Sequence, residues 1–152
     1  MKIVVLHSGN VGFFPRFYES LVNSIKRHGD DAYLVAPNSG RNKRRILYNQ
    51  ILYGERLNWF IHAAIYKITG LQDIFSIFDT LCLLRVLKKI SPDIVHLNIV
   101  NDKVLNMPLF VHYINKHKIR VVWTMHDCRA FTGQCPYFDE IDCPSMKYSL
   151  FC

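Results

Sequence analysis

The sequence contains no long uninterrupted apolar segment. No stretch approaches the roughly 18 apolar residues that a membrane-spanning helix requires, so we expect no transmembrane helix. The apolar run at residues 3–6 is too short for the core of a signal peptide, and no small-residue cleavage site follows it. We therefore expect a cytoplasmic protein.

Acidic residues are scarce. The chain has 12 Asp and Glu against 19 Lys and Arg, which gives a formal net charge of +7. A basic balance favours anionic partners, whether nucleic acid, phosphorylated ligands or an acidic membrane surface. No nucleic-acid-binding motif is present, so we do not expect binding to DNA or RNA.

Closely spaced cysteine pairs are also absent. Structural zinc sites usually contain a Cys-x2–4-Cys pair, whereas the last four of the five cysteines are separated by six, seven and eight residues. Free thiols are therefore the favoured interpretation, and we expect no metal and no other cofactor. A metal site, if there were one, would use Cys128, Cys135, Cys143 and Cys152.

What is present indicates one globular domain. The length of 152 residues fits a single domain, and a hydrophobic content of 50% excludes a disordered chain. Short apolar runs alternate with segments of helical periodicity, which is typical of a parallel α/β sheet with helices on both faces. The patterns predict strands near 2–7, 32–36, 93–97 and 120–125, helices over 15–28, 57–69, 76–90 and 106–118, and an irregular cysteine-bearing tail from about 126.

Polar residues follow three of the predicted strands. In parallel sheets, ligands bind beyond the carboxyl ends of the strands. This rule predicts one site that brings together catalytic His126 and Asp127 with the substrate-binding residues Gly9, Asn10, Gly12 and Asn98.

Each of these residues has a functional and a structural interpretation. Small residues such as Gly9 let backbone N–H groups approach a phosphate at a helix N-terminus, but the spacing matches neither a dinucleotide fingerprint nor a P-loop, so an ordinary turn stays open. His126 can hydrogen-bond a sugar hydroxyl or a phosphate oxygen, and Asp127 can orient a ring or cap a turn. We interpret Asp93 as a turn or cap residue and His96 as a hydrogen-bonded core histidine.

The stretch 41–67 mixes cations with Trp, Tyr and Phe. This mixture suits a segment that lies on an anionic bilayer. It also occurs where aromatic side chains pack inward and the cations stay solvated. The sequence leaves both interpretations open.

Two segments carry a resemblance to a known family. Residues 93–97 (DIVHL) and 121–135 (VVWTMHDCRAFTGQC), with Tyr-Phe-Asp at 137–139, resemble the N-terminal domain of bacterial family-4 glycosyltransferases, which assemble capsule, exopolysaccharide or lipopolysaccharide. The run from His126 to Cys135 is long and specific. Residues 2–6 and 68–71 fit the same family more loosely, so the resemblance covers nearly the whole chain.

The resemblance implies a Rossmann-like domain, the acceptor-side half of a GT-B enzyme whose C-terminal donor-binding domain is absent from this sequence. It implies metal-independent, retaining transfer of a sugar from a nucleotide sugar to a glycan acceptor, which we expect to be lipid-linked, at the inner membrane face. His126 matches the family's cleft histidine, and Gly9 and Gly12 approximately match its glycine loop. We expect this chain alone to be inactive. A non-catalytic binding or scaffolding module with the same half-fold is the alternative.

Overall fold

The computed structural model describes residues 1–10, 12–39, 42, 46–47, 49–54, 76–100 and 105–127. Five strands form one all-parallel sheet in the order β3-β2-β1-β4-β5. The strands are β1 (Lys2–Leu6), β2 (Asp31–Pro37), β3 (Gln50–Tyr53), β4 (Ile94–Leu97) and β5 (Arg120–Trp123).

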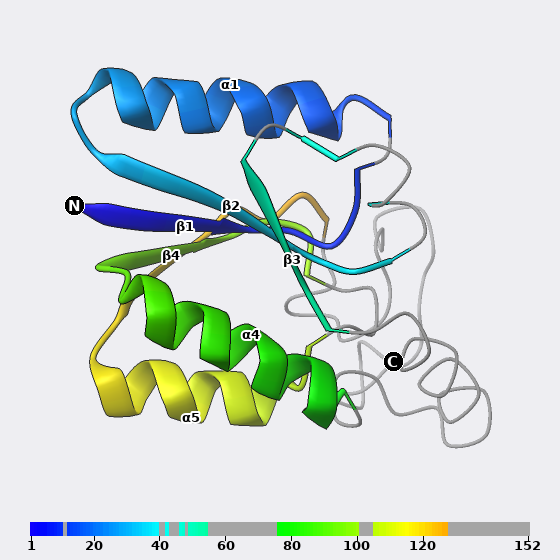
Figure 1. Cartoon of the computed structure of the whole chain (residues 1–152), viewed down its shortest axis with the longest axis vertical. Coiled ribbons are helices and arrows are strands. Elements are labelled where there is room, and N and C mark those ends of the chain that lie inside the picture. Colours follow the sequence, from blue (N-terminus) through cyan, green and yellow to red (C-terminus); the bar gives the residue numbers. More distant parts are fainter. Residues whose placement is uncertain are drawn as a thin grey trace, which may run out of the picture.

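Helices cover both faces of this sheet (Figure 1). Helix α1 (Phe14–Arg27) lies on one face, and α4 (Ile77–Ile90) and α5 (Met107–His117) lie together on the other. This arrangement confirms the predicted α/β fold and is that of a Rossmann-like domain. Because all strands run the same way, their carboxyl ends meet at one edge, which we call the carboxyl edge.

The central strand shows why the strands are apolar throughout. Val4 and Leu6 belong to the core cluster that includes Leu83 of α4, whereas Val5 packs with Tyr18 of α1. Alternate side chains of β1 therefore enter opposite layers, and both layers are covered. A strand of this kind must be apolar at every position rather than at every second one.

The helix ends follow the sequence signals. Pro15 lies in the first turn of α1, and Gly29 adopts a positive φ of 84° just beyond its last turn. Asn106 caps α5, because its side-chain oxygen accepts a hydrogen bond from Leu109 N at 2.9 Å. Helix α4 ends at Ser91, which adopts a left-handed conformation with φ of 52°.

Strand β3 is an element that the sequence patterns did not predict. Its four residues pair with β2 in the register Leu34↔Gln50 to Pro37↔Tyr53. The predicted helix over 57–69 lies outside the described residues, as do the four clustered cysteines. Among the described helices, none has the length and apolarity needed to cross a membrane.

Candidate functional site at the carboxyl edge

The segments that follow β1, β4 and β5 are joined by backbone hydrogen bonds. Ser8 N donates to Ile99 O at 2.7 Å, and Asn98 N donates to Leu6 O at 2.9 Å. Thr124 N donates to Leu97 O, also at 2.9 Å. The parallel topology therefore places Gly9, Asn98 and His126 at the same edge of the sheet.

His126 contacts Asn98 and two aromatic rings of α1. Its Nε2 lies 3.3 Å from Asn98 Oδ1, so a protonated Nε2 donates to the amide oxygen. The rings of Phe14 and Phe17 meet the imidazole edge-on, with centroids 5.3 and 5.6 Å away. These contacts fix the ring while leaving it half-buried.

Asn98 is the most enclosed polar side chain beside His126. The residue is 1% exposed, and its Nδ2 has no hydrogen-bond partner among the described residues. A buried amide donor without a partner is costly, typically by about 1–3 kcal/mol. Asn98 Nδ2 is therefore a donor group at the carboxyl edge that the described residues leave unpaired.

A second imidazole lies near His126. His96 Nε2 is 2.7 Å from Thr124 Oγ1, which agrees with its interpretation as a hydrogen-bonded histidine. Burial lowers the pKa of His96, and the proximity of His126 lowers it further. His96 is thus held in the neutral form and adds no positive charge to this edge.

A third imidazole, that of His7, is part of the core. It is 1% exposed and stacks on Tyr18, with ring centroids 4.1 Å apart. Its Nε2 lies 3.3 Å from Gln50 Nε2. Burial lowers the pKa of His7 to about 3, against a weaker opposing effect of the Gly9 backbone. His7 is therefore neutral at physiological pH.

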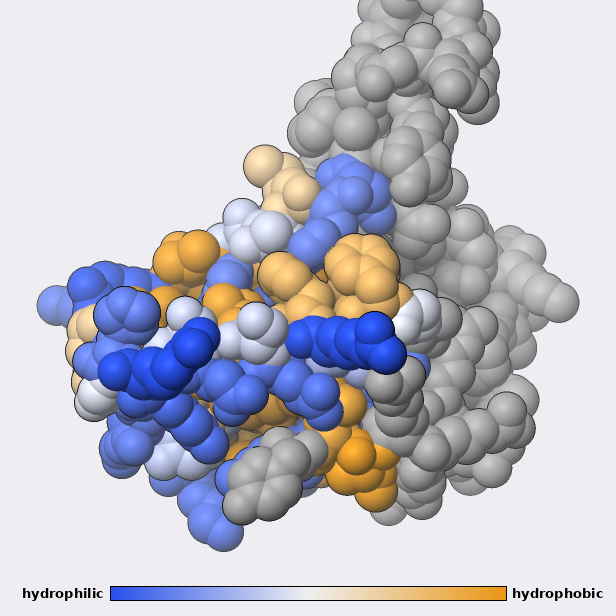
Figure 2. Space-filling view, turned by 90° about the horizontal axis from the view of Figure 1, so that it is seen from above, coloured by the Kyte–Doolittle hydropathy of each residue, from blue (hydrophilic) through white to orange (hydrophobic). Residues whose placement is uncertain are grey.

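Aromatic side chains of α1 connect His7 with His126. Tyr18 stacks on His7, Phe14 lies 5.9 Å from Tyr18 between ring centroids, and Phe14 in turn contacts His126. Figure 2 shows apolar side chains lying among the charged ones on this face of the molecule. Phe14 and Phe17 are partly buried and pack against the core cluster that contains Tyr18. These aromatic residues were not predicted as part of the site, although their helical spacing places them on one face of α1.

The segment of residues 8–10, which we call the edge loop, is held from its other side. Asn10 N donates to Asn42 Oδ1 at 2.8 Å, and Asn10 Nδ2 donates to Gln50 Oε1 at 2.9 Å. Asn10 thus contacts the connection between β2 and β3 rather than Asn98 or His126. Neither Asn42 nor Gln50 was singled out from the sequence.

Gly12 lies between the edge loop and α1. Its φ is 61°, and a Cβ built there would meet no atom of the described residues within 4 Å. A positive φ of this size favours glycine for its backbone conformation. The N-cap of α1, Phe13, makes no side-chain capping bond, so the helix N-terminus opens toward this edge without a side-chain cap.

Two aspartates that the sequence singled out lie in different places. Asp127 is half-buried beside His126 in the sequence. Asp93 Oδ2 accepts a hydrogen bond from Lys2 N at 2.7 Å, so Asp93 is a structural residue as expected. Within the described ranges, no group of three or more His, Cys, Asp or Glu side chains is placed to hold a metal ion.

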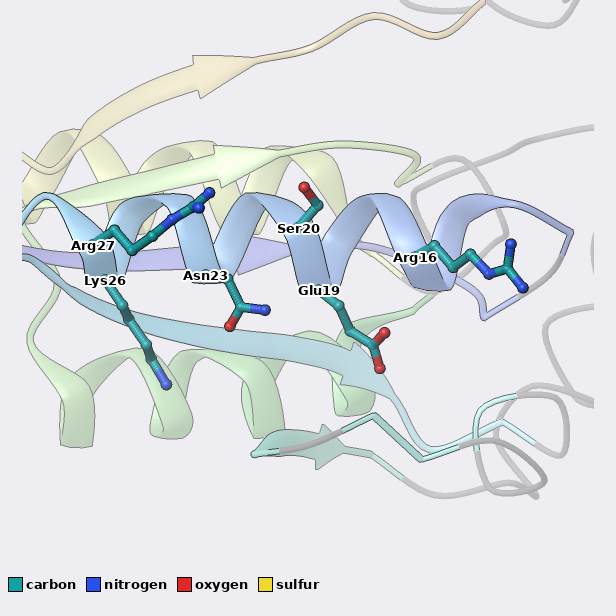
Figure 3. Close-up of a pocket in the computed structure, with 6 residues that line it drawn as sticks. All are labelled: Arg16, Glu19, Ser20, Asn23, Lys26 and Arg27. Atoms are coloured by element: carbon teal, nitrogen blue, oxygen red, sulfur yellow. The ribbon is translucent and has the colours of Figure 1, made fainter.

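A charged depression lies along the outer surface of α1 (Figure 3). All of the residues that line it are exposed, and none belongs to the predicted site. A surface of this kind is typical of a solvated helix face. The lining residues are Arg16, Glu19, Ser20, Asn23, Lys26 and Arg27.

Comparison with known proteins adds nothing to this geometry. Neither a family model nor a curated protein matches the chain.

Proposed function

We propose that this chain is the acceptor-side domain of a retaining glycosyltransferase that builds a cell-surface polysaccharide. The observation that carries the proposal is the position of His126. It begins the long motif that resembles family-4 glycosyltransferases, and it lies against buried Asn98 at the carboxyl edge. A motif histidine placed at the ligand-binding edge of a parallel sheet supports a substrate-binding role.

The chemistry of the edge suits a sugar. Asn98 and His126 are hydrogen-bonding groups, and the aromatic rings of Phe14 and Phe17 border His126. Hydroxyl groups need such paired donors and acceptors. The N-terminus of α1 offers backbone N–H groups that suit a phosphate. The donor, a nucleotide sugar, would be held by a second domain, and no metal is required in this scheme.

Removing the imidazole in the living cell tests this role. The native gene is replaced by a His126→Ala copy in the organism that carries it, and surface polysaccharide is compared on gels. We expect the glycan to be lost or shortened while the amount of the protein is unchanged. The exposed Asn23 of α1 (Figure 3) supplies the matched control, Asn23→Ala, which should leave the glycan intact. Normal glycan in the His126→Ala strain would contradict the proposal.

A non-catalytic binding module remains the second candidate. A transfer assay distinguishes the two candidates, because a binding module would bind a glycan without transferring a sugar to it. A gene product that binds the acceptor but transfers no label from any nucleotide sugar would favour the binding module.

We also propose that residues 41–67 dock the domain on the cytoplasmic side of an anionic membrane. Most of this stretch lies outside the described residues. Of its described apolar residues, Ile46 is 62% exposed, whereas Leu47 and Tyr53 are each 4% exposed and belong to the core. Exposed Ile46 beside a run of cations supports a surface role for the first part of the stretch.

Vesicle co-sedimentation tests the docking. Each Lys or Arg near an anionic surface contributes about 1 kcal/mol, and salt screens this attraction. We expect binding to vesicles of phosphatidylglycerol that weakens with salt and falls when four cations become Ser. Equal binding to neutral phosphatidylcholine vesicles, or none to anionic vesicles at low salt, would contradict it. The cations are Arg41, Lys43, Arg44 and Arg45.

A further inference from the structure

Two amide side chains bond to the edge loop, that of Asn42 from the connection between β2 and β3 and that of Gln50 from the first residue of β3. We propose that Asn42 and Gln50 are positioning residues that hold the edge loop in the conformation that binds substrate. The role of the two amides in fixing the edge loop is independent of the proposed function. The statement that the edge loop binds an acceptor rests on the proposed function.

Asn42 uses both ends of its side chain to close the edge loop. Its Nδ2 donates to Ser8 O at 3.0 Å and to Pro37 O at 2.8 Å, while its Oδ1 accepts from Asn10 N. The residue is 0% exposed, so water cannot replace these bonds. One buried amide thus joins the end of β2 to both ends of the edge loop.

Gln50 makes a parallel set of bonds from the first residue of β3. Its Oε1 accepts from Asn10 Nδ2 and from Leu47 N, each at 2.9 Å. Its Nε2 lies 3.3 Å from His7 Nε2. The side chain of Asn10 is therefore held by Gln50 while the backbone of Asn10 is held by Asn42.

The edge loop is consequently held on two sides. Ser8 N donates to Ile99 O, which follows β4. Ser8 O accepts a hydrogen bond from Asn42 Nδ2. The β4 side carries Asn98 and His126, and the β2–β3 side carries the two amides. Substituting Asn42 or Gln50 therefore releases the edge loop on the β2–β3 side and leaves Asn98 and His126 in place on the other side.

The hydrogen bonds of Asn42 and Gln50 act on the conformation of the edge loop more than on the formation of the sheet. Asn42 and Gln50 are polar and belong to neither apolar core cluster, although Tyr53 of β3 and Leu47 of the β2–β3 connection do. Every side-chain polar atom of Asn42 and of Gln50 has a partner within 3.3 Å, and amides paired in this way hold one loop conformation. The expected defect is therefore a loosened loop in a sheet that stays formed.

Amide hydrogen exchange on the purified chain measures the loop directly. In Asn42→Ala we expect the amide of Asn10 to lose protection, while Val5 in the centre of β1 keeps its wild-type rate. Asn23→Ala, an amide removed from the exposed surface of α1, should change neither. Unchanged protection at Asn10, or equal loss at Asn10 and Val5, would overturn the proposal.

Gln50 supplies a second pair of variants in case Asn42→Ala does not fold. Gln50→Glu keeps an oxygen to accept from Asn10 and Leu47, and its second oxygen faces the His7 nitrogen, which can carry the proton. Gln50→Ala keeps neither acceptor. We expect Gln50→Ala to lose protection at Asn10 and Gln50→Glu to restore it. Equal behaviour of the two variants would overturn the proposal.

Ligand binding then tests the link to substrate. The probe is farnesyl-diphosphate-linked N-acetylglucosamine, with farnesyl diphosphate and inorganic phosphate as controls. Gln50→Ala should weaken binding of the probe by roughly 2- to 12-fold per folded molecule, as one hydrogen bond of typical net strength would. Gln50→Glu should bind like wild type. If wild type does not bind the probe, the acceptor assignment fails, and the exchange data alone decide whether the amides hold the loop.

Discussion

Replacing His7 by phenylalanine should remove a large part of the acid sensitivity of this fold. His7 is 1% exposed, and burial lowers its pKa from 6.5 to about 3. Below pH 6.5 the unfolded chain binds a proton at this residue that the folded chain does not bind. Stability due to His7 is therefore fully present above pH 6.5 and is lost as the pH falls toward 3.

The expected size follows from the two pKa values. Between pH 7 and pH 5 the unfolded His7 becomes almost fully protonated while the folded His7 stays neutral, which costs the wild type about 2 kcal/mol. Because native domains are stable by only about 5–15 kcal/mol, this loss is readily measured. Phenylalanine keeps a ring to stack on Tyr18 but cannot titrate.

The assay is urea unfolding of both proteins at pH 7, 6 and 5, with the free energy of unfolding extrapolated to water. At pH 7 His7→Phe should be less stable by about 1 kcal/mol, because Gln50 Nε2 loses its contact with the imidazole. At pH 5 the order should be reversed. All other titrating groups are common to both proteins and cancel in the difference. Parallel stability curves would refute the reasoning.

Three further substitutions test two backbone turns and one helix cap. Gly54 has a φ of 74°, and a Cβ there would collide with the carboxylate of buried Asp79, so Gly54→Ala should destabilise the fold by about 2–4 kcal/mol. Gly29→Ala, with φ of 84° but open space, should cost only about 1 kcal/mol in the same urea assay, and equal losses would contradict the collision. Asn106→Ala removes the N-cap of α5 and should lower the free energy of unfolding by about 1 kcal/mol; an unchanged value would show that the cap is dispensable.

The sequence predicted the elements that have strong local signals. Continuous apolar runs predicted β1, β2, β4 and β5, and the capping residues Pro15 and Asn106 marked the beginnings of two helices. Strand β3 was missed because its four residues show no alternation and become a strand only by pairing with β2. Pairing of that kind is a tertiary effect that no local pattern contains.

The sheet topology predicted which residues lie at the site, but not their long-range side-chain contacts. The rule for parallel sheets placed Asn98 and His126 at one edge, and their side chains are indeed in contact. The contacts of His7 with Tyr18 and Gln50 could not be predicted, because Gln50 is 43 residues away and its side chain reaches His7 only through the pairing of β3 with β2. The hydrogen bonds of Asn42 are of the same long-range kind.

The proposed role of the His126 imidazole in sugar transfer can be measured directly. The gene product, as its cell makes it, is incubated with radiolabelled nucleotide sugars and the lipid fraction of the same cells, and label in lipid-linked glycan is counted. Wild type and Asn23→Ala should transfer label equally. His126→Ala should be slower by roughly 10²- to 10³-fold, the usual effect of losing one hydrogen bond to the reacting group, with an unchanged circular dichroism spectrum. A His126→Ala protein that transfers label at the wild-type rate would contradict the account.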